Sequence, residues 1–188
     1  MKEAENDPDI QFILAVNLIE CKKGFPFKYL KKSMKKENID ALIYYIKMII
    51  KGKKIPKNHE KAKKLIDNNF KNQEDKYFEL YGRLFYYEND LSNAQKCFIK
   101  SLKLNNDESM YYYGKILLIS GKSKEIKEFG MNILNEAIKR NNVKAMFLYG
   151  KYIKKNFSFN MKHVAILNEI SKTHNKDLFE SYLKENCS

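Results

Sequence analysis

Hydrophobic residues recur along most of the chain at spacings of three and four positions, the pattern of helices with one buried face. The predicted helices span approximately residues 9–22, 26–36, 39–51, 58–71, 74–88, 91–104, 107–120, 124–140, 142–154, 160–173 and 176–186. Their predicted N-cap residues are Asp9, Asn58, Ser92 and Asp107. Short connectors require successive helices to pack antiparallel, and only seven Gly and three Pro disfavour a fold of many β-turns. The sequence therefore predicts an all-α protein.

A tripeptide that ends in glycine recurs inside the predicted helices, as Leu80–Gly82, Tyr112–Gly114 and Leu148–Gly150. The glycines are 32 and 36 residues apart, and the same frame holds Ile46 a further 36 residues upstream. A glycine inside a helix costs about 1 kcal/mol relative to alanine. Three glycines in one frame therefore predict close contact between the two helices of a hairpin. Such a hairpin cannot bury its apolar face alone, so its neighbours must stack on it.

In the segment 40–71, the loop holds Gly52 and the pair Ile55–Pro56, and the second helix opens with Lys61–Ala62. This segment resembles a Sel1-like repeat, a family that has Gly, Val-Pro and Lys-Ala at these places. Ile46 replaces a glycine of the family pattern. The resemblance extends over roughly residues 38–172 and implies a right-handed α-solenoid that serves as a protein-interaction scaffold without catalysis.

The segment 76–105 more closely resembles a tetratricopeptide repeat. Its small and aromatic positions are Gly82, Phe85, Ala94 and Phe98. We therefore expect one helical-repeat domain over residues 1–188, with about four to five antiparallel helix-pair repeats. Its predicted parts are a degenerate opening unit at 9–37, repeats at 38–72, 74–105, 107–141 and 142–173, and a C-terminal capping helix at 176–186.

The net charge of +13 is unevenly distributed along the chain. Residues 22–64 contain fifteen Lys against three acidic residues, a net +12. Lysine makes up 34 of the 36 basic residues, which an AT-rich coding sequence would also produce, and it is poorer than arginine at bidentate recognition. The candidate contacts to RNA or an acidic surface are Lys31, Lys32, Lys35, Lys36, Lys53, Lys54 and Lys57.

The position directly after the small residue of the repeat frame is basic in all four aligned units. These residues are Lys47, Arg83, Lys115 and Lys151. In tetratricopeptide-like arrays this position usually points into the concave face, where Tyr86 and Tyr111 would add aromatic contacts. One interpretation is a solvated lysine face. The other is a row of positive charge that binds an acidic peptide, a chain terminus or a phosphate backbone.

Motifs for catalysis, cofactors and metals are absent from the sequence. The three histidines have no metal-ligand or nucleophile spacing, and the three cysteines form no CxxC pair. The acidic, polar N-terminus is unlike a signal peptide, and the apolar stretches are too short to span a membrane. We expect a non-enzymatic cytoplasmic or nuclear protein with no cofactor, small-molecule substrate or membrane partner.

Two functions from different classes remain open at this stage. The first is a scaffold that binds a protein segment in a basic groove or assembles with copies of itself, with the amphipathic segment 178–183 either capping its own chain or joining another. The second is a basic module that docks on RNA or a ribonucleoprotein through its lysine-rich N-terminal third. The repeat spacing favours the first function, and the +12 segment favours the second.

Overall fold

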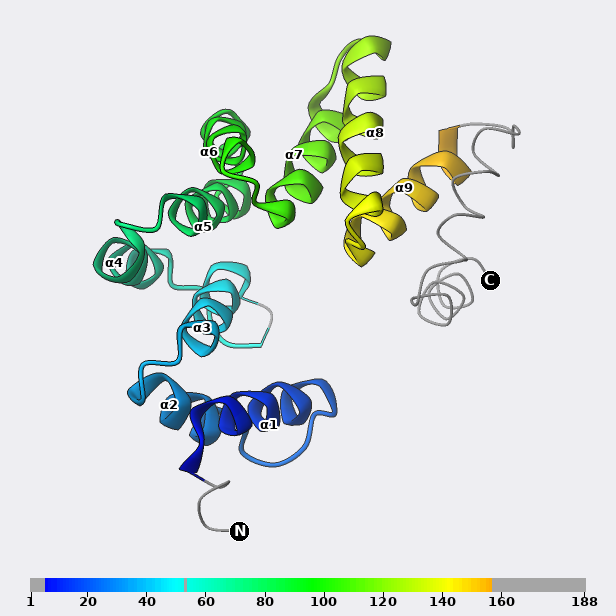
Figure 1. The fold of residues 1–188 in the computed structure, drawn as a ribbon. Helices are drawn as coiled ribbons and strands as arrows, with labels where there is room; N and C mark the ends of the chain where they lie inside the picture. The colour runs from blue at the N-terminus through cyan, green and yellow to red at the C-terminus, as the bar shows by residue number, and fades with distance from the viewer. Residues whose placement is uncertain (1–5, 53, 157–188) are drawn as a thin grey trace. The chain divides into compact units, whose positions relative to one another are not determined.

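The computed structural model describes residues 6–52 and 54–156, which form helices joined by short loops with no strand among them (Figure 1). The helices are α1 (Pro8–Glu20), α2 (Pro26–Lys35), α3 (Ile39–Lys51), α4 (His59–Phe70), α5 (Glu74–Tyr87), α6 (Leu91–Lys103), α7 (Asp107–Ser120), α8 (Lys124–Lys139) and α9 (Val143–Asn156). The predicted all-α class is confirmed. The predicted helices at 160–173 and 176–186 lie outside the described residues.

The chain divides into two compact units. Unit 1 ends at Lys71 and contains α1 to α4, and unit 2 starts at Asn72 and contains α5 to α9. In both units, each helix packs on the next one in the chain. In unit 2 the first helices of successive pairs also touch, because α7 contacts both α5 and α9. Side chains on these three helices can therefore form one continuous surface.

The repeated glycines lie where the two helices of a hairpin approach most closely. A Cβ atom at Gly82 would lie 2.6 Å from the Phe98 ring, and one at Gly114 would lie 2.8 Å from Cγ of Leu134. On the opposing helix, a Cβ atom at Gly130 would lie 3.2 Å from the carbonyl oxygen of Gly114. Contacts under 3 Å do not occur at real Cβ atoms, so Gly82 and Gly114 permit a helix spacing that larger residues would prevent. The predicted close contact between paired helices is confirmed at Gly82 and Gly114.

The loop that joins one helix pair to the next has the same structure at three places. A residue in the left-handed conformation ends the helix, with φ of 62°, 61° and 61° at Glu37, Asn105 and Asn141. The next residue is an asparagine whose side chain accepts a hydrogen bond from a backbone amide of the following helix, at Asn38, Asn106 and Asn142. This pattern satisfies backbone groups at both helix ends.

The connection between α4 and α5 departs from this pattern. Its N-cap residue, Gln73, makes no capping hydrogen bond, and no described residue of the connection has a positive φ. The boundary between units 1 and 2 falls at this connection. The repeated asparagine loop thus marks junctions within a unit, and its absence coincides with the division of the chain.

Two buried serines connect the second helix of a pair to the start of the first. Ser33 of α2 donates a hydrogen bond to the carbonyl oxygen of Pro8 at 2.7 Å, and Ser101 of α6 donates one to that of Asp75 at 2.9 Å. Ser109 of α7 in turn donates to the Ser101 hydroxyl at 2.8 Å. These bonds satisfy polar groups inside the helix pairs and extend the contact to the next pair.

Replacing Gly114 with leucine should destabilise the protein, because the new side chain would overlap Leu134 and the α8 backbone. Overpacking of this kind typically costs about 1–3 kcal/mol. Urea denaturation followed by circular dichroism measures this loss. Lys124→Leu, at an exposed helical position, is the matched control. Equal stability of Gly114→Leu and the control would contradict the close approach of α7 and α8.

Candidate functional site

Arg83, expected in a row of exposed cations, lies instead in the interior of unit 2. Its side chain is only 6% exposed. The guanidinium donates hydrogen bonds from Nε to Glu79 on its own helix, from Nη1 to the Tyr112 hydroxyl at 2.9 Å and from Nη2 to Glu108 at 2.7 Å. It also lies 4.6 Å from the centroid of the Tyr112 ring. The guanidinium of Arg83 is therefore paired within unit 2, whereas it was expected from the sequence in a row of cations facing a partner.

The pairing extends from Arg83 to a third helix. Glu108, at the start of α7, also accepts hydrogen bonds from Lys144 of α9, with 3.0 Å to each carboxylate oxygen. The side chains of Glu79, Arg83, Glu108 and Lys144 therefore form a chain of alternating charge across α5, α7 and α9. We call this set the α5–α9 charge network. Its formal charges cancel. Glu79 and Arg83 are buried, where an unpaired charge is costly, whereas the side chains of Glu108 and Lys144 are 37% and 52% exposed.

The pKa of Arg83 reflects this compensation. Burial alone would lower the pKa of the guanidinium, since it disfavours the charged form. Interactions with Glu79, Tyr112 and Glu108 outweigh burial and raise the pKa above its ordinary value. Arg83 is therefore charged at neutral pH.

Three of the residues predicted to bind a partner do lie together. The Nζ atom of Lys115 lies 5.1 Å from the centroid of the Tyr86 ring and 5.7 Å from that of Tyr111. Tyr86 comes from α5 and the other two from α7, so successive helix pairs assemble the group. We call these three residues the Tyr–Lys cluster. All three side chains are half-buried.

The hydroxyl groups of both tyrosines stabilise the charge of Lys115. Burial lowers the pKa of this ammonium, but hydrogen bonds and charge interactions with Tyr86 and Tyr111 outweigh it, and the pKa is raised. Burial also raises the pKa of Tyr111, which keeps its phenol protonated at neutral pH. The Tyr–Lys cluster thus offers one fixed positive charge between two aromatic rings.

The remaining members of the predicted basic row differ in exposure. Lys47 lies on α3 in unit 1 and is half-buried, whereas Lys151 lies on α9 in unit 2 and is exposed. One arginine of the row is buried and only one lysine is fully exposed. Partner binding by these four residues stays a prediction.

The lysines predicted to contact RNA or an acidic surface are exposed in unit 1, apart from Lys53, which lies outside the described residues. Their exposed members are Lys31, Lys32, Lys35, Lys36, Lys54 and Lys57. The ammonium of Lys36 donates to the carbonyl oxygen of Asn6, and that of Lys54 donates to the carbonyl oxygen of Ile19 at 3.2 Å. Most of the positive charge of this unit faces solvent.

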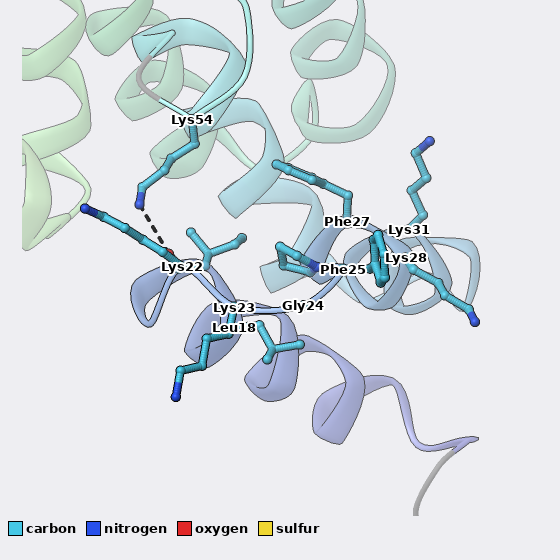
Figure 2. A pocket seen from close by; sticks show the side chains of 11 residues that line it. Leu18, Lys22, Lys23, Gly24, Phe25, Phe27, Lys28, Lys31 and Lys54 are labelled. Atoms are coloured by element: carbon cyan, nitrogen blue, oxygen red, sulfur yellow. Dashed lines mark hydrogen bonds between the residues drawn. The ribbon is translucent and has the colours of Figure 1, made fainter.

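A hollow of about 590 Å³ in unit 1 brings some of these lysines around an apolar surface (Figure 2). Its apolar lining comes from Leu18, Ile19 and the segment Gly24–Phe27. The lysines that line it are Lys22, Lys23, Lys28, Lys31 and Lys54. We call it the lysine-rimmed pocket. Sequence reasoning identified Lys31 and Lys54 but missed the pocket, although the alternation of lysine and phenylalanine over residues 22–28 was a usable signal.

Comparison with family models, with curated proteins and with solved structures returns no match to this chain. The resemblance to Sel1-like and tetratricopeptide repeats therefore stays a prediction. In the described part of the chain, His, Cys, Asp and Glu side chains form no group of three or more that could hold a metal ion. Over the same residues, every helix is too short or too polar to span a membrane.

Replacing Arg83 with methionine should destabilise the protein by about 3–5 kcal/mol, because Glu79 is 3% exposed and would lose its guanidinium partner. Chemical denaturation measures the free energy of unfolding. Lys151→Met, at the exposed equivalent position, should change it by less than about 0.5 kcal/mol. Adding Glu79→Leu to Arg83→Met should recover much of the loss. An Arg83→Met protein as stable as Lys151→Met would refute the buried role of the arginine.

Proposed function

We propose that this protein is a non-catalytic scaffold that binds an acidic segment of a protein partner on a surface formed by successive helix pairs. In this proposal the helix pairs form a right-handed solenoid of four to five repeats, like the Sel1-like repeats that residues 38–172 resemble. The observation that carries the proposal is the Tyr–Lys cluster, because two successive pairs contribute to it and its members are held in place before any partner arrives.

The chemistry of the Tyr–Lys cluster suits a protein segment. Tyrosine is enriched at the energetically dominant positions of protein interfaces, since it combines a large apolar surface with a hydroxyl group. The rings of Tyr86 and Tyr111 flank the Lys115 ammonium, and a partner carboxylate at this point would gain a charge interaction and apolar contact together. Fixed side chains also lose less conformational entropy on binding.

The α5–α9 charge network determines which charges of this surface are available to a partner. Arg83 and Lys144 are paired with carboxylates, whereas Lys115 contacts tyrosines and Lys151 is exposed one helix pair further on. Positive charge on consecutive first helices would attract an acidic segment that runs across α7 and α9. The binding surface we propose therefore consists of the Tyr–Lys cluster and Lys151.

Replacing Lys115 and Lys151 with glutamate should weaken binding of the native partner at least about tenfold, since like charges would repel the acidic segment. The measurement is affinity capture from native extract, with and without nuclease treatment, quantified by mass spectrometry. Lys103→Glu/Lys122→Glu supplies the matched control, because both lysines are exposed in unit 2 and the change in net charge is the same.

The proposed surface is correct if the control captures the same proteins as the wild type and the Lys115/Lys151 variant does not. Equal capture by all three proteins would contradict it. Loss of all captured protein on nuclease treatment would assign the protein to RNA or ribonucleoprotein binding. Light scattering on the purified wild type reports whether the captured partner is a second copy of this chain.

A further inference from the structure

We propose that the lysine-rimmed pocket of unit 1 is a second binding site, which takes a large apolar side chain from a peptide segment with acidic residues on both sides of it. This site is separate from the surface formed by the Tyr–Lys cluster. It requires no contact with unit 2, because its lining comes from α1, α2, the loop between them and Lys54, all within unit 1.

The centre of the pocket is apolar because of the path of the loop between α1 and α2. Gly24 has φ +62°, a conformation that glycine adopts without strain, and it brings the chain against Leu18 of α1. Pro26 then starts α2, so that Phe25 and Phe27 lie on either side of this turn. Figure 2 shows Leu18 and Gly24 beside one another, with the two phenylalanine rings across from them. The volume of about 590 Å³ is ample for one leucine or phenylalanine side chain.

Exposure of Phe25 is a second indication of binding. Phe25 is 82% exposed, although burying a ring of this size against an apolar surface is favourable. The neighbouring ring of Phe27 is half-buried in the core cluster of unit 1. Phe25 is therefore an apolar group at the edge of an apolar hollow, and a ligand side chain seated there would cover it.

The positive charges around the pocket are available to a ligand. Among the described residues, Lys22, Lys23, Lys28 and Lys31 take part in no ion pair, and all four are exposed. Lys54 donates to the Ile19 carbonyl oxygen, which holds its ammonium at the edge of the hollow. In the view of Figure 2, Lys22 and Lys54 lie at one end and Lys28 and Lys31 at the other. Charges at both ends match an apolar residue with carboxylates before and after it.

The same features favour a peptide over RNA. A nucleobase carries hydrogen-bonding groups on its edges, and burying them without partners costs free energy. Leu18, Pro26 and Phe27 offer no side-chain donor or acceptor, and the carbonyl oxygen of Ile19 already accepts from Lys54. A leucine or phenylalanine side chain has no such requirement. The rim also contains lysine only, which attracts carboxylates without the bidentate geometry that arginine provides for phosphate.

Three synthetic peptides test the two components of this recognition. The first, acetyl-Glu-Glu-Leu-Phe-Glu-Glu-amide, carries both the apolar anchor and the flanking charges. The second replaces Leu-Phe with Gly-Ser, and the third replaces every Glu with Gln. Isothermal titration calorimetry on the full-length protein should show that the first peptide binds at least about tenfold more tightly than either of the others. Equal binding of the first two would overturn the role of the apolar pocket.

Variants of the protein locate the site. Binding of the first peptide should weaken at least about fivefold in the double variant Lys28→Glu/Lys31→Glu and also in Phe25→Ser. The controls are Lys57→Glu/Lys64→Glu, with the same change in charge on exposed lysines of unit 1, and Phe129→Ser, at a 51% exposed ring of unit 2. Circular dichroism melting of each variant confirms that it is folded. Because Phe25 is exposed, Phe25→Ser keeps the test decisive even if the double variant does not fold.

The proposal would be overturned if the two control variants lost as much affinity for the first peptide as the pocket variants do. The proposal would also be overturned if an oligouridylate or phosphatidylserine vesicles bound more tightly than the peptide and if Phe25→Ser weakened that binding. The pocket would then bind RNA or a membrane surface. Neither result bears on the Tyr–Lys cluster, whose own variants leave unit 1 unchanged. Failure of one proposal is therefore distinguishable from failure of the other.

Discussion

The arrangement of unit 2 depends on the hydrogen bonds and ion pairs that the buried guanidinium of Arg83 makes. This guanidinium joins two acidic residues and a tyrosine from two helices, and through Glu108 it is connected to Lys144 on a third helix. Removing Arg83 or Glu79 would leave a charge in a poorly solvated site, so α5 and α7 must keep the spacing at which the guanidinium is paired. The glycines at the hairpin contacts set a second distance, between α7 and α8. Together they determine how successive pairs stack in this unit.

This constraint divides the positive charge of the protein into two classes. In unit 2, carboxylates pair with Arg83 and Lys144, whereas Lys115 lies beside two tyrosine rings and takes part in no ion pair among the described residues. In unit 1, the lysines of α2 and of the adjoining loops face solvent around an apolar hollow. Total charge and its distribution along the sequence do not distinguish the two classes. The proposed binding surfaces follow from which charges remain unpaired.

The features predicted correctly from the sequence are those with local causes. Helix positions follow from the spacing of apolar residues. The cap at Asn58 is also local, because its side chain accepts a hydrogen bond from the backbone amide three residues later. Three helices instead take Asp7, Asp90 and Asn106 as caps, one or two residues before the predicted Asp9, Ser92 and Asp107, because several polar residues compete at each start. The closeness of the paired helices was also predictable, since a glycine inside a helix lowers stability unless a neighbouring element needs the space that a side chain would fill.

The burial of Arg83 and the lysine-rimmed pocket were not predictable, because each depends on residues from separate elements. Glu79, four residues before Arg83, was a visible partner, but Glu108 and Tyr112 belong to the next repeat.

The most direct test of the division between paired and free charge is the acylation rate of each lysine, measured by mass spectrometry on the intact protein near neutral pH. We expect Lys144, which is paired with Glu108, to react several-fold more slowly than Lys23, Lys28 and Lys31. Equal rates at Lys144 and the pocket lysines would contradict this division.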